Sequence, residues 1–373
     1  MKVKSALFIV LTAFLITVTN SPLIAAGTID IDRVRDKVVL NDQDKKVIDD
    51  FLADSVGDIL KTRDFTSIAK LRTVILSRQK SNQESQNQYT NQFSESAYKY
   101  ISEGFQQALI LRPQERQTRV IINLLILING LQDLRLIDLA IEKLKDENMA
   151  VRYWAVQSVT NAGILNQLNS DNTSIRKQAQ RITEQLQQIV DSSSPEILAL
   201  IAGFAAGLDI PQADELLLQI ADLRIKRYAD WTMKYEKLEN VILKLLEAKM
   251  TLPASSTAGR KPAADFARRF AQLYSYVIQR YIKGETLDDT QKQYLVTVLI
   301  DIEEKCISKF LGQQFTIRNA IEQKDMAALE AEHNRLLGSQ ENTGLLLTKL
   351  KFDYGTNSDG SKRNAPLPLP DQP

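Results

Sequence analysis

Apolar residues recur at helical intervals along most of this chain. After Asn41 and Asp42, two good helix-capping residues, apolar side chains return about every 3.6 positions from Val47 to Leu60. The same periodicity predicts further helices at residues 65–78, 93–111, 264–282, 287–311 and 316–337, and a long amphipathic pattern covers 223–250. Gly and Pro are few, and the wealth of Leu, Ile, Ala, Gln, Lys and Glu favours helix over strand. The sequence therefore predicts an all-α protein.

Two segments, Val120–Ile128 and Ile197–Leu208, are almost wholly apolar. We expect both to be buried helices that pack on more than one side, which implies a layered array of helices. The second segment follows Pro195, a favourable first residue of a helix. It is too short to cross a bilayer, which takes about 20 residues. The spacing of its Gly203 and Gly207 predicts close packing against a neighbouring helix.

Three stretches interrupt the helical pattern. Residues 81–91 are rich in Gln, Asn and Ser, which predicts an exposed loop or a frayed helix end. Residues 251–262 combine Pro, Gly and Ser and form the strongest internal boundary. Residues 353–373 include the run APLPLP at 365–370, which alternates proline as polyproline II segments do. We expect a flexible tail there, with a docking peptide as the alternative.

The N-terminus has the three-part order of a secretory signal peptide. Lys2 and Lys4 precede an apolar run from Ala6 to Val18, and Pro22 then breaks the helix ahead of Ala25 and Ala26. This order predicts a signal peptide at residues 1–26, cleaved after Ala26. A retained N-terminal anchor is the alternative, because Ile24, at position −3 relative to the cleavage site, is larger than the small residue preferred there.

Composition narrows the class of protein further. Without Lys2 and Lys4 the 47 basic residues fall to 45 against 46 acidic ones, a formal net charge of −1. This balance gives no reason to expect a nucleic-acid partner, which would favour a basic excess. The single cysteine excludes an intramolecular disulfide, so the fold depends on packed area. An exported chain so poor in cysteine is typical of the bacterial periplasm.

One part of the chain carries repeated strings of similar residues. Each string has an acidic residue, then an apolar and a basic residue in succession, then alanine: Asp146, Val151, Arg152, Ala155 and Val159; Asp171, Ile175, Arg176, Ala179 and Ile182; Asp222, Ile225, Lys226 and Ala229. The region from about 119 to 250 resembles the HEAT or armadillo-like superfamily of helical repeats. The resemblance implies a short α-solenoid in which Val151 and Ala155 pack between layers. It also implies that the Asp and Arg positions of the first two strings form a structural ladder between turns.

Candidate catalytic side chains are scarce. His333 is the only histidine and lies in a charged helical stretch, so we expect it at the solvated surface. Cys306 is the only cysteine, and we expect it to be buried as a small hydrophobic residue. A nucleophilic Cys306–His333 pair is the alternative. Two such side chains are too few for a zinc site.

Acidic residues offer no recognisable metal site either. Asp288 and Asp289 suit the start of a helix, and Asp30, Asp32 and Asp36 lack the spacing of a calcium loop. The chain has no glycine-rich phosphate loop, nucleophile elbow or dinucleotide fingerprint. We therefore predict no catalytic residue, no cofactor, no metal and no enzyme activity. A carboxylate-dependent hydrolase stays open, because glycosidases need only two carboxylates.

Aromatic residues are the best candidates for an interaction surface. Tyr228, Trp231 and Tyr235 have spacings of three and four, which would place them on one face of a helix, and Tyr153 and Trp154 mark the first repeat-like helix. The alternative is that these side chains fill the core between layers.

Together these patterns predict an exported, periplasmic, all-α protein. Its predicted parts are the signal peptide 1–26, a HEAT-like α-solenoid at 27–252, a small helical bundle at 263–352 and a flexible tail at 353–373. The predicted function is a non-catalytic scaffold that binds a protein or another envelope component along the concave face of the repeat. No membrane span is expected after signal cleavage, and the oligomeric state stays open. A self-assembling structural protein of the envelope and the hydrolase are the alternatives.

Overall fold

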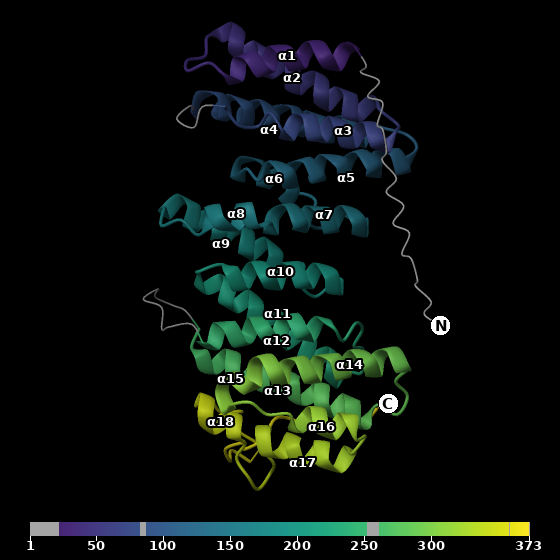
Figure 1. Ribbon diagram of the computed structural model, residues 1–373, viewed down its shortest axis with the longest axis vertical. Coiled ribbons are helices and arrows are strands. Elements are labelled where there is room, and N and C mark those ends of the chain that lie inside the picture. The colour runs from purple at the N-terminus through teal and green to yellow at the C-terminus, as the bar shows by residue number, and fades with distance from the viewer. Residues whose placement is uncertain (1–21, 83–86, 252–260, 358, 373) are drawn as a thin grey trace, which may run out of the picture. The chain divides into compact units, whose positions relative to one another are not determined.

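The computed structural model describes residues 22–82, 87–251, 261–357 and 359–372 (Figure 1). Across these ranges the chain is helical, and the β-structure consists of two isolated bridges, Gly338 to Thr343 and Thr356 to Lys362. The prediction of an all-α protein is therefore confirmed. The chain divides into two compact units, residues 1–104 and 105–373.

The first unit contains three complete helices and most of a fourth. These are α1 (Pro22–Arg35), α2 (Asp42–Lys61), α3 (Phe65–Leu76) and α4 (Asn87–Leu109), which continues into the second unit. α2 packs against both α1 and α3. The predicted cap of α2 is confirmed, because Asn41 and Asp44 exchange side-chain and backbone hydrogen bonds as a capping box. The predicted cleavage point after Ala26 falls inside α1, and most of the predicted signal peptide, residues 1–21, lies outside the described residues.

The second unit contains the other helices. In chain order they are α5 (Gln114–Leu131), α6 (Ile137–Ile141), α7 (Met149–Thr160), α8 (Ala162–Leu168), α9 (Thr173–Gln187), α10 (Pro195–Gly207), α11 (Pro211–Ala229), α12 (Leu238–Thr251), α13 (Ala263–Lys283), α14 (Asp289–Ile302), α15 (Ser308–Leu311), α16 (Thr316–Glu322), α17 (Met326–Leu337) and α18 (Leu345–Leu350). A 3₁₀ turn at Leu134–Leu136 precedes α6, and a π-helical turn at Glu303–Ile307 joins α14 to α15.

The helices of this unit pack in two series. In one series α5 contacts α7, α7 contacts α10, and α10 contacts α12 (Figure 1). In the other, α9 contacts α11, α11 contacts α13, and α13 contacts α17. α10 packs on α11 and α12 packs on α13, so the two series also contact each other. α13 consequently lies among neighbours from both.

The compact units differ from the predicted domains. Sequence places a boundary between residues 252 and 263, whereas the second unit contains the helices on both sides of it. The physical reason is that α13 packs extensively against α11 and α12, which the prediction assigns to another domain. Residues 252–260 of the predicted linker lie outside the described residues.

Both apolar segments are buried helices, as predicted. Leu124 and Ile128 of α5 and Ile201 of α10 are completely buried. The two glycines of α10 differ, however. A Cβ at Gly207 would lie 2.5 Å from a methyl carbon of Leu165, whereas a Cβ at Gly203 would meet no atom within 4 Å. Only Gly207 therefore marks a close approach of another helix.

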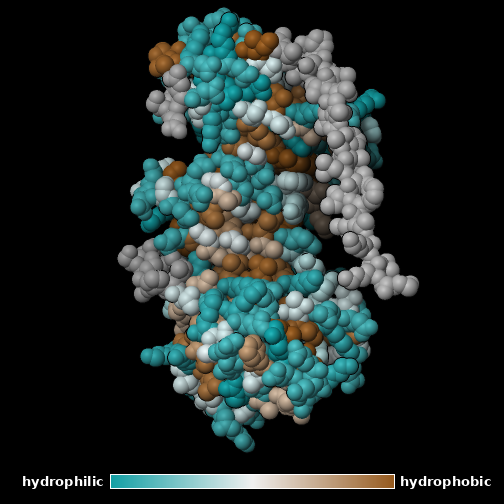
Figure 2. Space-filling view, viewed as in Figure 1, coloured by the Kyte–Doolittle hydropathy of each residue, from teal (hydrophilic) through white to brown (hydrophobic). Residues whose placement is uncertain are grey.

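The outer side of α10 is apolar as well. Leu200 and Ala206 are half-buried, and Gly203 between them is exposed. Figure 2 shows hydrophobic side chains reaching the surface in the middle of the second unit, around α7 and α10. α10 is thus apolar on its outer as well as its inner side.

Some helices are shorter or longer than predicted. The pattern at 223–250 forms two helices, because α11 ends at Ala229 and α12 begins at Leu238. The predicted helix 316–337 is likewise divided into α16 and α17, with Asp325 capping the second. α4 begins at Asn87, inside the stretch expected to be an exposed loop or a frayed helix end.

The first repeat-like string has the predicted packing. Val151 and Ala155 are buried, and Arg152 donates hydrogen bonds to the backbone carbonyls of Asp146 (2.8 Å) and Glu147 (3.2 Å). The third string does not follow an inter-helix turn, because Asp222 lies in the middle of α11. The matching of its residues to a repeat was wrong.

Candidate peptide-binding site

Residues 366–371, which we call the tail, lie against α13 and are not part of a free segment as the sequence predicted. The contacts of the tail advance along the helix: Leu367 contacts Gln272, whereas Asp371 contacts Lys283. From Gln272 to Lys283 the helix rises about 16 Å, whereas four fully extended residues reach about 14 Å. The segment therefore runs along the helix in an extended form, and the long Lys283 side chain covers the remaining distance. The prediction of a flexible tail was wrong. It rested on composition, which cannot show contacts between residues as far apart in the chain as Leu367 and Gln272.

Glutamine and lysine side chains of α13 bind the backbone of the tail. Gln272 accepts a hydrogen bond from the Leu367 amide (2.8 Å) and donates one to the Leu367 carbonyl (3.1 Å). Gln279 accepts from the Leu369 amide (2.7 Å), and Lys283 donates to the Leu369 carbonyl (2.9 Å). Since the partners are backbone groups, these contacts depend on the conformation of the tail more than on its side chains.

Two further residues contact the tail. The indole Nε1 of Trp231 donates to the Pro370 carbonyl (2.9 Å), and the Tyr276 hydroxyl donates a long hydrogen bond to the Pro368 carbonyl (3.5 Å). Burial raises the pKa of Tyr276, which keeps its hydroxyl protonated as a donor.

We call this set of residues the tail-binding face: Trp231, Gln272, Tyr276, Gln279 and Lys283. The four residues on α13 recur at intervals of four, three and four, which places them in one stripe along the helix. Trp231 joins them from the segment between α11 and α12. One helix and one loop therefore provide all of the face.

Two side chains of the tail, three residues apart, are buried. Pro366 and Leu369 are buried, the latter with only 1% of its surface exposed, whereas Leu367 is 43% exposed. A polyproline II helix has three residues per turn, so residues 366 and 369 share one side of it. The tail thus presents one apolar side to the protein.

Buried charges support the loop that carries Trp231. The Arg280 guanidinium lies 5.2 Å from the centre of the Trp231 ring and donates to Glu236 (3.2 Å). Beneath it, Arg224 forms an ion pair with Glu239 (2.6 Å), and both side chains are completely buried. Burial outweighs the effect of Arg224 and raises the pKa of Glu239. These pairs tie α11, α12 and α13 to the loop.

The three aromatic residues from Tyr228 to Tyr235 lie in different surroundings. Tyr228 is completely buried on α11, whereas Tyr235 is 46% exposed and lies against Tyr294, with ring centres 6.2 Å apart. They share no helix face with Trp231, because α11 ends at Ala229, before both Trp231 and Tyr235. Of the three, Trp231 contacts the tail.

The other two predicted aromatics are on α7. Tyr153 and Trp154 are half-buried and pack edge to face, with ring centres 5.7 Å apart. The sequence prediction missed Gln272, Gln279 and Lys283, although their regular spacing along an amphipathic helix was a usable signal.

The two candidate nucleophilic residues have structural surroundings. Cys306 is buried as expected, and burial raises the pKa of its thiol to about 12, so the thiol stays protonated near neutral pH. His333 is buried as well, contrary to the prediction, because α17 packs against α13. Its Nε2 lies 2.8 Å from the Ser275 hydroxyl, and burial lowers its pKa.

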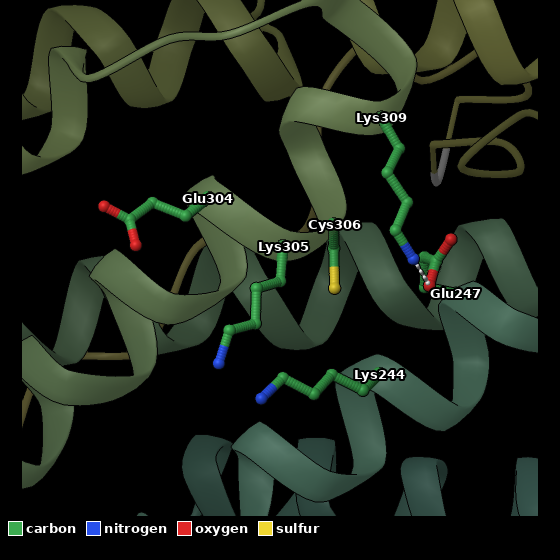
Figure 3. Close-up of a pocket in the computed structure, with 6 residues that line it drawn as sticks. All are labelled: Lys244, Glu247, Glu304, Lys305, Cys306 and Lys309. Atoms are coloured by element: carbon green, nitrogen blue, oxygen red, sulfur yellow. Dashed lines mark hydrogen bonds and ion pairs between the residues drawn. The ribbon is translucent and has the colours of Figure 1, made fainter.

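A cavity of about 460 Å³ lies between α12 and the π-helical turn, as Figure 3 shows. Its lining residues are Lys244, Glu247, Glu304, Lys305, Cys306 and Lys309. Lys309 forms an ion pair with Glu247 (2.8 Å), and Lys244 and Lys305 both pair with Asp301. These carboxylates balance the lysine charges, so the cavity has no strong preference for an anion. Within the described ranges, no group of three or more His, Cys, Asp and Glu side chains is placed to hold a metal ion.

Comparison with known proteins gives little guidance. No family model and no curated protein matches the sequence. Among solved structures, the crystal structure of an engineered protein is 13% identical over 86% of this chain and 99% of that chain, with a TM-score of 0.18. At that TM-score the similarity supports no statement about fold or function. None of the helices in the described ranges combines the length and apolar character needed to cross a membrane.

Proposed function

We propose that this protein is an exported, periplasmic, non-catalytic scaffold that binds extended segments of other proteins. One observation carries the proposal: the tail-binding face holds an extended segment through its backbone. Backbone recognition accepts any chain that adopts the same conformation, because amide and carbonyl groups are common to all residues.

The arrangement of helices supports a scaffold of the HEAT or armadillo kind. Each helix of the series α5, α7, α10 and α12 packs on its predecessor, as repeat units do when they bury their apolar sides on one another. In this proposal residues 27–252 are the repeat, and the helices beyond residue 263 extend it with the tail-binding face.

The proposal is tested by releasing the tail in the full chain. Leu369→Asp places a charge in a buried apolar site, so the tail should leave the face. Leu367→Asp is the matched control, because this nearby side chain is 43% exposed, compared with 1% for Leu369. We expect Leu369→Asp to capture more of a partner protein from the native cell envelope than wild type or Leu367→Asp does.

A triple variant tests whether the captured protein binds at the tail-binding face. Adding Gln272→Ala and Gln279→Ala to Leu369→Asp should abolish the additional capture, because these glutamines no longer form hydrogen bonds with the partner's backbone. Equal capture by all four proteins would refute the proposed function.

A further inference from the structure

We propose that the tail is a self-ligand, and that the tail-binding face selects partner segments with the same pattern: Pro-x-x-Leu followed by an acidic residue two positions later. The inference rests on the proposed function and names the chemistry of the partner. It follows from four features of the bound tail.

The first feature is the match between prolines and hydrogen bonds. Leu367 and Leu369 have backbone N–H groups, and both donate to glutamines of the face. Residues 366, 368 and 370 are prolines, which have no N–H to donate. The face therefore requires a donor only where the sequence provides one, and alternating prolines lose nothing by binding.

The second feature is the conformation that proline imposes. Proline restricts the free segment to conformations near polyproline II, so less entropy is lost when it binds. Segments without prolines could form the same hydrogen bonds at a larger entropic cost. Proline-rich segments are favoured for this reason.

The third feature is the apolar contact. Pro366 and Leu369 are the buried side chains among residues 366–371. Their spacing of three would place them on one side of a polyproline II helix. A partner segment thus needs apolar residues at both positions. At position 367 the side chain is 43% exposed, so the face discriminates less there.

The fourth feature is charge. Lys283 donates to the Leu369 carbonyl and forms an ion pair with Asp371 at 3.0 Å. A carboxylate two residues after the leucine is thereby favoured, and a basic residue there would repel Lys283. Because both side chains reach solvent, the preference should weaken as salt increases.

The attached tail competes with any partner. A tethered segment has an effective concentration in the millimolar range, so a weak intramolecular contact can exclude a free ligand. A partner must displace the tail or bind when the tail is absent from the face. The tail thus limits binding to partners that match the pattern well.

The test measures binding of a fluorescent peptide with the sequence of residues 364–372 to the full chain by anisotropy. Leu369→Asp protein should bind it about tenfold or more tightly than wild-type or Leu367→Asp protein does. A peptide carrying Leu369→Asp should bind the Leu369→Asp protein at least about tenfold more weakly than the unchanged peptide. A peptide carrying Asp371→Lys should bind it about twofold to fivefold more weakly at low salt, because the ion pair is exposed. Thermal melting curves check that every protein variant is folded.

Three results would overturn the inference. One is equal binding of the unchanged and Asp371→Lys peptides, and another is no peptide binding to the Leu369→Asp protein. The third is a wild-type dimer in solution that Leu369→Asp abolishes, because the occupant would then be the tail of a second copy. Envelope capture without peptide binding would refute this pattern alone, whereas peptide binding without capture would refute the proposed function alone.

Discussion

Individual residues show what periodicity can and cannot reveal. His333 lies in a charged stretch, yet it is in line with Leu329 and Leu336 at spacings of four and three, and all three are buried. Charge density suggested the surface, whereas helical spacing indicated the inner side. For a single polar residue, the spacing of its apolar neighbours was the better guide.

Cys306 should be unreactive in the folded protein. Its thiol is buried with a pKa raised to about 12, so the reactive thiolate is scarce at pH 8. We expect a thiol reagent to label almost none of the native protein within minutes and one thiol per chain in denaturant. Rapid labelling of the native protein would show that the site is open.

Val151 should be essential for stability. Val151→Asp would place an unpaired charge between helices, so the free energy of unfolding should fall by about 3 kcal/mol or more. Met149→Asp on the same helix is the control, because Met149 is 58% exposed at the start of α7. Urea denaturation of both variants measures the difference, and equal midpoints would contradict the buried position of Val151.

Whole helices were predictable where local chemistry defined their ends. Asn41 and Asp288 cap α2 and α14 through capping boxes, and Pro195 begins α10. The break between α11 and α12 had no Pro or Gly signal. Arg224 donates to the backbone carbonyls of Lys234 and Tyr235 in the loop between them. Contacts between a buried side chain and a loop form only in the folded structure, so the sequence pattern did not reveal this break.

Removing one partner of the Arg224–Glu239 ion pair should cost more stability than replacing both partners with apolar residues. Arg224→Ala leaves Glu239 buried without its partner, which should cost about 3–5 kcal/mol of stability. The double variant Arg224→Met with Glu239→Leu removes both charges and should recover most of that loss. Thermal or urea denaturation tests this. A double variant no more stable than Arg224→Ala would show that the ion pair itself provides the stability.

For the whole molecule, sequence identified the fold class and the polyproline segment, but not where that segment binds. The hydrogen bonds between Leu367 and Gln272 join residues far apart in the chain, and no local pattern encodes such a pairing. The compact units at 1–104 and 105–373 likewise depend on long-range packing. Residues 251–262 are a strong local break, yet tertiary contacts of α13 override it as a domain boundary.

Export of the protein predicts where the mature chain begins. If residues 1–26 are a signal peptide, the mature protein begins at Gly27. N-terminal sequencing of protein from fractionated cells measures this start. Intact Met1 on protein from the soluble cytoplasmic fraction would contradict export.

The central claim is that α13 binds the backbone of an extended segment, and amide hydrogen exchange at Leu369 tests it most directly. In the full chain this amide donates to Gln279, so it should exchange at least about tenfold more slowly than in an unstructured peptide. Gln279→Ala should remove the protection, whereas Gln279→Glu, which keeps an acceptor oxygen, should retain part of it. Exchange of Leu369 at the unstructured rate in the wild-type protein would contradict the account.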